Sequence, residues 1–599
     1  MRKYFVTILI VFLQLGYAGA AKVTQQAAAR YAARLMGMTT DPVAETGSAM
    51  HSASRGQGRD PEYYIFNNPD GGWAIISADD RTMPVIAYSD EGRFITEDMP
   101  ENMVQWMDDV ASTIDDARKS GETVSEQVKD AWMMLDGTKS QAAETKKWIK
   151  TASWDQESPY NESCPRITGE SRKSPAGCMA TAMAITLRHN SWPAHGKGTI
   201  GGYSTITKGY YIKPYSINNH NYDWDEMPMT NAATAVWTFE QKQQVAQLMY
   251  DCGVMIMMNY TQDGSGAFPE DVVPALKNHL LYSDKVTLLS RLPYSADEWF
   301  SLLANEIDAD RVCIMSGKSV QKGGHAFVCD GYDTDGQKIH INWGWGGNNN
   351  GYYTLDLRYR ENEIYNYYQT VIIGIAPNTA AVDLDVSPRL VHQFGTDSDG
   401  VDFFGIKPVN VNDRKAPVDV VRNSAFSFSI GVLENTADTE RSYDIKVCLM
   451  DSAGTVRQEG WEMHVDFPAF YAYVMWTSAT TLNVDPAPTD YFMLYAKLKG
   501  GEWEPVQGNH DFDPDIKGVC CGIAPDPIII RPETCVAGQE MELKLTLGYI
   551  PYTSVKWTLN GSEYNESKWV IESGETVIRA DVEYLDGSTG SIWTTINAE

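Results

Sequence analysis

The sequence has few basic residues for its size. It contains 49 Lys and Arg against 79 Asp and Glu, and its formal net charge is −30. A protein that binds a phosphate backbone or an anionic membrane surface needs a positive field, which this composition does not supply. We therefore expect no nucleic-acid partner.

Cysteine is also scarce, with nine residues in 599. No C-x-x-C pair occurs and the ten histidines do not cluster with the cysteines, so neither a structural metal site nor a cofactor is expected. An odd count leaves at least one thiol unpaired if all the others pair. One cysteine is thus available for chemistry.

Long apolar runs are missing beyond the N-terminus. The cationic start Met1-Arg2-Lys3 is followed by the apolar run Tyr4–Leu15 and the small residues Ala18-Gly19-Ala20. About 12 apolar residues fall short of the ~20 that a spanning helix needs. This pattern predicts a secretory signal peptide at residues 1–20, cleaved near Ala20, and no transmembrane segment.

The remaining length suggests about four folding units at roughly 150 residues each. An α+β unit is predicted at 21–145, with a β-hairpin at 63–77, a helical region at 101–135 and a polar linker from 137 that a protease could cut. A second unit is predicted at 146–377. Short alternating strands then predict two β-sandwich, Ig-like modules at 378–524 and 525–599.

The candidate nucleophile is Cys178, which follows Pro175 and Gly177 and precedes an apolar run to Leu187. The run predicts a helix buried nearly all round, with Cys178 at its start. Free backbone N–H groups and the helix dipole at that end favour a thiolate. We therefore expect a lowered pKa for Cys178 and an oxyanion site beside it.

The candidate base is His325, in a predicted strand that starts at Gly323 and Gly324. A turn at 333–336 returns the chain as a second strand, which predicts that Asn342 lies near His325. Cysteine-dependent acyl transfer needs a thiolate, an imidazole and a group that orients the imidazole. The two glycines would let a substrate backbone approach closely.

Other cysteines and histidines fit this chemistry less well. Cys329 lies four residues from His325 on the same strand face, roughly 13 Å away along a strand, and is too distant for a direct pair. Cys164 precedes no apolar helix. The turn at 333–336 lacks the ligand pattern of a calcium loop.

The segments 177–182, 324–328 and 342–347 resemble the nucleophile helix, the histidine strand and the following strand of the streptopain family of secreted bacterial cysteine peptidases. The hairpin region at 63–77 is similar to the inhibitory propeptide of that family. The resemblance implies a papain-like fold for the second unit. It also implies an oxyanion-hole role for Gln156, in Trp154-Asp155-Gln156, and a shielding role for Trp343 at the imidazole; which of Asn342 and Trp343 orients the ring stays open.

These observations predict a secreted cysteine endopeptidase, made as a zymogen whose own prodomain, residues 21–145, inhibits it until the linker is cut. Protein or peptide substrates are the expected partners. We expect the β modules to serve adhesion, substrate docking or cell-surface association. Two alternatives remain open: a transglutaminase-like acyl transferase, which also uses Cys and then His in chain order, and a catalytically inactive binding protein.

Overall fold

The computed structural model describes most of the chain, and all structural statements below concern these residues. The described ranges are 22–38, 43–45, 60–97, 99–120, 124–138, 145–218, 220–291, 293–318, 324–355, 369–384, 386, 388–393, 405–508, 518–532, 534–584 and 588–598. The predicted signal peptide lies outside them, as do residues 139–144 of the predicted linker.

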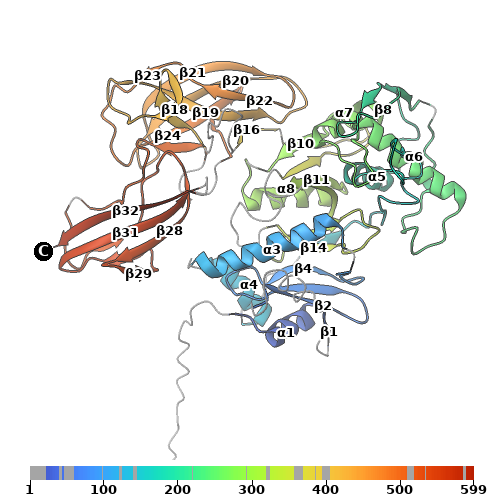
Figure 1. Cartoon of the computed structure of the whole chain (residues 1–599), viewed down its shortest axis with the longest axis horizontal. Helices are drawn as coiled ribbons and strands as arrows, with labels where there is room; N and C mark the ends of the chain where they lie inside the picture. Colours follow the sequence, from blue (N-terminus) through green and yellow to red (C-terminus); the bar gives the residue numbers. More distant parts are fainter. Residues whose placement is uncertain are drawn as a thin grey trace, which may run out of the picture.

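The N-terminal part, which we name the prosegment after the role that the sequence predicts for it, is an α+β unit spanning described residues 22–138 (Figure 1). Its elements are α1 (Gln25–Leu35), β1 (Val43–Glu45), β2 (Tyr63–Asn67), β3 (Trp73–Ser77), β4 (Val85–Ser89), α3 (Glu101–Ser120) and α4 (Glu126–Asp136). The predicted hairpin is confirmed, because β2 and β3 pair antiparallel around a turn in which Asp70 N donates to Asn68 Oδ1 at 3.1 Å. Such Asx turns explain why Asn and Asp mark this reversal.

The middle part, which we name the peptidase unit after the role that the sequence predicts for it, contains helices packed on an antiparallel sheet. Its longer elements are β5 (Lys146–Trp148), α5 (Cys178–Asn190), α6 (Phe239–Met255), α7 (Val272–His279), β10 (Thr287–Ser290), α8 (Ala296–Asp308), β11 (Cys313–Lys318), β12 (Gly324–Asp333), β13 (Lys338–Asn342), β14 (Gly351–Thr354) and β15 (Thr370–Ile373). Its shorter elements are β6 (Thr199–Ile200), β7 (Tyr203–Ser204), β8 (Tyr211–Ile212), β9 (Tyr215–Ser216), η1 (Trp224–Glu226) and η2 (Pro269–Asp271).

The prosegment and the peptidase unit share one sheet, which the sequence did not indicate. The strand order is β1-β2-β3-β4-β14-β13-β12-β11-β15-β10, with β5 paired to β12. The junction is the β4–β14 pair, where Tyr352 lies opposite Tyr88 and their rings stack at 5.1 Å. Pairing covers the edge that each of the two sheets would otherwise expose to solvent.

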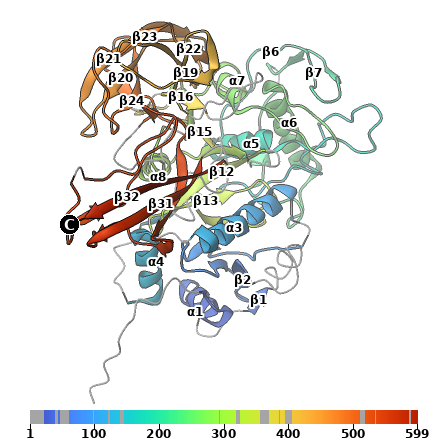
Figure 2. The same ribbon diagram turned by 60° about the vertical axis from the view of Figure 1, so that its left-hand side comes forward.

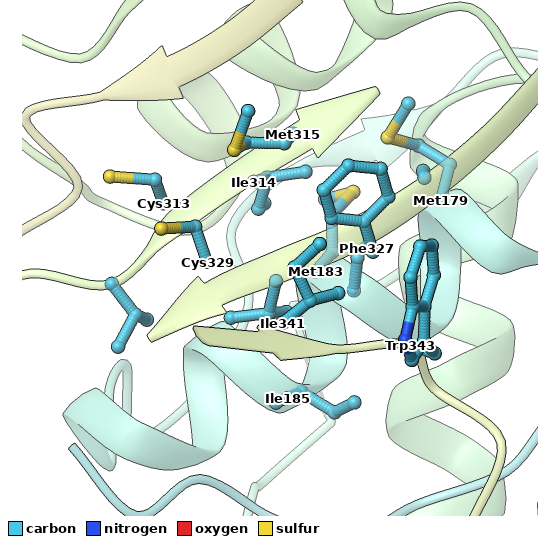
Figure 3. Close-up of a cluster of buried hydrophobic side chains, with 14 of the residues drawn as sticks. Met179, Met183, Ile185, Cys313, Ile314, Met315, Phe327, Cys329, Ile341 and Trp343 are labelled. Atoms are coloured by element: carbon cyan, nitrogen blue, oxygen red, sulfur yellow. The ribbon is translucent and has the colours of Figure 1, made fainter. Parts of the chain in front are cut away.

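Helix α5 lies against this sheet and is its most buried helix. Every residue from Met179 to Leu187 is buried. Figure 3 shows Met179 and Met183 in one apolar cluster with Phe327 of β12 and Trp343. The predicted all-round burial of the helix is confirmed, and it fixes the position of the helix start relative to β12.

The C-terminal part is all β and forms two modules (Figure 2). The first β module comprises β16 (Leu390–Gln393), β17 (Lys407–Asn410), β18 (Asp413–Pro417), β19 (Ala425–Asn435), β20 (Arg441–Met450), β21 (Val456–Phe467), β22 (Tyr471–Trp476), β23 (Thr480–Thr481), β24 (Tyr491–Leu498), β25 (Glu504–Pro505) and β26 (Cys520–Gly522). The second comprises β27 (Glu540–Glu542), β28 (Tyr552–Leu559), β29 (Ser562–Tyr564), β30 (Lys568–Val570), β31 (Gly574–Tyr584) and β32 (Thr589–Ala598).

Each β module has its own apolar core. In the first, Phe426 and Phe428 of β19 pack with Phe492 of β24, which belongs to a different sheet. The second is built around Trp569, Ile578 and neighbouring apolar residues. No helix in the described part of the chain is both long and apolar enough to span a bilayer.

Candidate active site

Cys178 is the first residue of α5, as predicted. Gly177 precedes it with φ 93°, and a Cβ at Gly177 would lie 2.8 Å from the Met258 side chain and 3.0 Å from the Ser265 carbonyl oxygen. Only glycine tolerates both the left-handed backbone and this close approach. The glycine before the cysteine therefore lets the chain enter the helix so that Cys178 is partly exposed.

The predicted lowering of the Cys178 pKa is wrong for this structure. Burial raises the pKa of the thiol, and this outweighs the backbone N–H groups of Ala326, Met179 and Cys178 itself, which lower it. The physical reason is that a thiolate here would lose solvation without gaining a cationic partner. Cys178 has no cationic partner because the buried His325 ring is neutral.

His325 is the second residue of β12 and is 2% exposed. Its Nε2 lies 3.1 Å from the carbonyl oxygen of Trp343, and its Nδ1 lies 2.9 Å from Nδ2 of Asn102 in the prosegment helix α3. Nε2–H donating to Trp343 and Nδ1 accepting from Asn102 satisfy both contacts with a neutral ring. Burial lowers the pKa of His325 to about 4, although the Trp343 carbonyl opposes that shift.

Two tryptophans surround the imidazole. The His325 ring stacks on Trp345 at 4.8 Å and on Trp343 at 5.9 Å, and the two indoles stack on each other at 5.1 Å. Both indole side chains are buried. The structure thus places Trp343 beside His325. It also places Trp345 there, which the sequence analysis missed, although Trp345 lies only two residues after Trp343 in the same W-G-W segment.

The Asn342 amide donates to groups other than the imidazole. In the β12–β13 ladder it lies opposite Val328, and its Nδ2 donates to Thr151 Oγ1 and to the Ala152 carbonyl, both at 2.9 Å. Strand β13 ends at Asn342, so the Trp343 carbonyl rather than the Asn342 amide reaches the imidazole. Register, which the sequence does not specify, thus gives the hydrogen bond to the imidazole to the Trp343 backbone, and an orienting role for Asn342 stays a prediction.

Gln156 lies next to the segment that leads into Cys178. Its carbonyl oxygen accepts from Ala176 N at 2.9 Å. Buried Trp154 anchors this segment, with Nε1 donating to the Pro228 carbonyl at 2.7 Å. The structure therefore brings Gln156 near the start of α5.

A cavity of about 550 Å³ joins these elements. Cys178, His325 and Gly324 all line it, so residues distant in sequence border one space. Gly323 lies outside the described residues. Sequence reasoning missed Asn102 and the cavity residues of the first β module, because neither carries a local pattern.

The other thiols have a different environment. Cys329 and Cys164 are buried, and burial raises the pKa of each. Cys313 lies directly opposite Cys329 in the β11–β12 ladder, and both belong to the apolar cluster in Figure 3. In the described part of the chain, no three His, Cys, Asp or Glu residues gather as metal ligands would.

Comparison with known proteins gives two family matches. Residues 154–353 match the Peptidase C10 family, and residues 20–114 match the Spi protease inhibitor family. These two stretches correspond to most of the peptidase unit and most of the prosegment.

Individual relatives agree with these matches. The chain is 27% identical over 399 residues to thiol protease/hemagglutinin PrtT of Porphyromonas gingivalis, covering 63% of this chain and 44% of that protein. It is 27% identical over 342 residues to streptopain of Streptococcus pyogenes, covering 52% of this chain and 80% of that protein. The aligned part thus spans less than half of the first relative.

Among solved structures, a prointerpain A fragment of Prevotella intermedia is 27% identical, with a TM-score of 0.43, covering 53% of this chain and 97% of that fragment. Residues 154–353 of this chain are thus similar to the Peptidase C10 family, and residues 20–114, in front of them, are similar to the Spi protease inhibitor family.

Proposed function

We propose that this chain is a secreted cysteine endopeptidase, made as a zymogen, which hydrolyses protein substrates through Cys178 and His325. The observation that carries the proposal is that these two residues line one cavity, with Cys178 at the start of a buried helix. The proposal includes a papain-like arrangement of the peptidase unit, with the nucleophile helix packed on the sheet that holds the histidine.

Latency follows from the contact between Asn102 and His325. With Asn102 at Nδ1 and the Trp343 carbonyl at Nε2, both ring nitrogens are occupied and the imidazole cannot accept the Cys178 proton. Removal of the prosegment would free Nδ1. His325 could then form an ion pair with the Cys178 thiolate, which supplies the cationic partner that is missing here.

The catalytic cycle then uses this chain's own groups. The thiolate attacks a peptide carbonyl, the Cys178 N–H and the Gln156 amide stabilise the oxyanion, and His325 protonates the leaving amine. Water hydrolyses the thioester, and His325 acts as base in that step. Trp343 and Trp345 hold the ring between the two proton transfers, and Gly323 and Gly324 admit the substrate backbone.

The remaining assignments belong to the same proposal. Residues 1–20 act as the signal peptide, 21–145 as the inhibitory prodomain with its cleavable linker, and 146–377 as the peptidase. Residues 378–524 and 525–599 form the two Ig-like modules, which we assign to attachment at the cell surface or to a substrate. Deletion of the second module should then reduce cell association and leave peptide hydrolysis intact.

Casein hydrolysis by the wild type beside Cys178→Ala tests the central claim. We expect Cys178→Ala to lose more than about 10⁴-fold in activity and to remain unprocessed at its N-terminus. Cys535→Ala, which removes another partly exposed thiol, should keep full activity. Cysteine-dependent incorporation of an amine into a glutamine donor, without hydrolysis, would instead support the acyl transferase.

A further inference from the structure

The first β module supplies one wall of the cavity at Cys178. Gln393 of β16, Val432 and Glu434 of β19, and Phe470 all line the cavity together with the nucleophile. None of the described prosegment residues lines it. Removal of the prosegment therefore leaves the residues of this wall in the chain.

Specific contacts hold the module in this position. Phe470 packs against the apolar core of the peptidase unit, and Lys277 of α7 forms an ion pair with Asp438, both side chains being largely buried. Arg389 donates to the Pro293 carbonyl at 2.7 Å and lies 4.7 Å from the centre of the Tyr294 ring. The chain is thus held against the peptidase unit just before β16, at Arg389, and after β19, at Asp438 and Phe470.

The polar lining contains several hydroxyl groups and two carboxylates, Glu270 and Glu434. Glu270 comes from the peptidase unit and Glu434 from the module, and Gln393 Nε2 donates to Glu434. This leaves Gln393 Oε1 without a partner, and Glu270 Oε2 and Ser265 Oγ are also buried without a hydrogen bond among the described residues. Among the described residues that line the cavity there is no Lys or Arg.

Such a lining matches one class of side chain. Buried acceptors without donors are unfavourable, and they are satisfied best by a ligand that brings several N–H groups and a positive charge. Val432 and Phe470 offer apolar surface beside them. Lys and Arg combine an apolar stem with a cationic donor head, so they fit both parts.

We propose that the first β module is part of the substrate-binding cleft, and that this cavity receives a Lys or Arg side chain of the substrate, with Glu434 and Glu270 as its specificity-determining groups. The inference rests on the proposed peptidase function and adds a substrate class to it. It also gives the module a role in hydrolysis that is independent of surface attachment. The volume of about 550 Å³ lies within the range of ligand pockets.

A peptide library tests this with the processed enzyme. Each of the four positions before the cleaved bond is varied in turn, and kcat/KM is compared for Arg, Lys and the neutral, unbranched norleucine. At one position the wild type should prefer Arg or Lys over norleucine by about tenfold or more. Glu434→Gln should reduce that ratio about tenfold, and Glu434→Arg should shift the preference to Glu.

Glu462→Gln is the matched control, because Glu462 is an exposed carboxylate of the same module that does not line the cavity. Titration with a thiol-directed epoxide counts the competent sites, so that a poorly folded variant is corrected for its active fraction. Glu270→Gln tests the opposite wall and should reduce the same ratio.

An unchanged Arg to norleucine ratio in both Glu434→Gln and Glu270→Gln would overturn the inference, as would a wild type without a basic preference at any position. In either case, hydrolysis abolished by Cys178→Ala would leave the proposed function intact. Absence of Cys178-dependent hydrolysis in the wild type would contradict the proposed function itself.

Discussion

The prosegment and the first β module flank the same peptidase unit but are attached in different ways. The prosegment continues the central sheet through the β4–β14 pair and reaches the imidazole through Asn102. The first β module has its own core and contacts the peptidase unit through Phe470 and through the ion pair of Asp438 with Lys277 of α7. The prosegment contacts the imidazole of His325, whereas the first β module borders the cavity beside Cys178.

This difference separates inhibition from recognition. A few contacts at His325 are enough to keep the thiol without a base, because both ring nitrogens are then engaged. The module borders the cavity beside Cys178, where we expect it to affect which substrate side chains fit. We therefore expect changes in the prosegment to alter when activity appears, and changes in the module to alter which peptides are cut.

The largest expected effect is a loss of stability in acid. One buried histidine next to the prosegment and another in the first β module each contribute to it. Burial lowers the pKa of His325, next to the prosegment, and of His392, in the module, to about 4 from 6.5. Above pH 6.5 neither the folded nor the unfolded chain protonates these histidines, so the neutral rings contribute their full share to the free energy of unfolding. It is lost as the pH falls from about 6.5 to about 4, because in this range the unfolded chain binds protons that the folded chain excludes.

At pH 4.5 each histidine should cost about 2.5 kcal/mol of unfolding free energy. Urea unfolding of the Cys178→Ala chain at pH 7 and pH 4.5 measures the total. His325→Gln and His392→Gln, placed in that background, should each shrink the loss by a similar amount. An undiminished loss in either variant would show that its histidine titrates normally.

Tyr88→Phe should weaken the attachment of the prosegment without touching His325. Tyr88 donates to the Asp333 carboxylate of the β12–β13 hairpin in a buried site, and the substitution leaves that carboxylate short of a donor. A hydrogen bond to a charged group contributes about 2 kcal/mol, so processing should accelerate roughly 30-fold. The lag before casein hydrolysis measures this, and an unchanged lag would mean that Tyr88 does not limit release.

Asn102→Ala should shorten the same lag by about fivefold, because it removes one neutral hydrogen bond of about 1 kcal/mol. Unlike Tyr88→Phe, it should also make Cys178 more reactive toward a thiol-directed epoxide before any cleavage, since it frees one imidazole nitrogen. Gln127→Ala, on the exposed face of α4, is the control. Equal epoxide rates in Asn102→Ala and the control would contradict the assigned role.

The smallest effect is expected for Asp438→Asn, which breaks the ion pair with Lys277 that anchors the module. A partly buried pair of this kind contributes about 1 kcal/mol. We expect KM for a basic peptide to rise by less than about fivefold with kcat unchanged. Asp485→Asn, which breaks an exposed pair with Arg422 within the module, should change neither constant.

The local parts of the site were predictable because local chemistry specifies them. A glycine followed by Cys178 and an unbroken apolar run defines a buried helix with the thiol at its start. The apolar strand with His325 and its Asp-rich turn define the β12–β13 hairpin. What these patterns do not contain is register, which placed Trp343 rather than Asn342 at the imidazole.

By itself, the sequence determined the acidic composition, the order of the units, the nucleophile at a helix start and the histidine on a strand, since each depends on neighbours along the chain. Only the tertiary structure decided that Asn102 occupies His325, that burial raises the pKa of the Cys178 thiol, and that the first β module borders the cavity. These features depend on contacts between segments far apart in the chain. Such contacts follow from the packing of whole units and leave no periodic or local mark in the residues that make them.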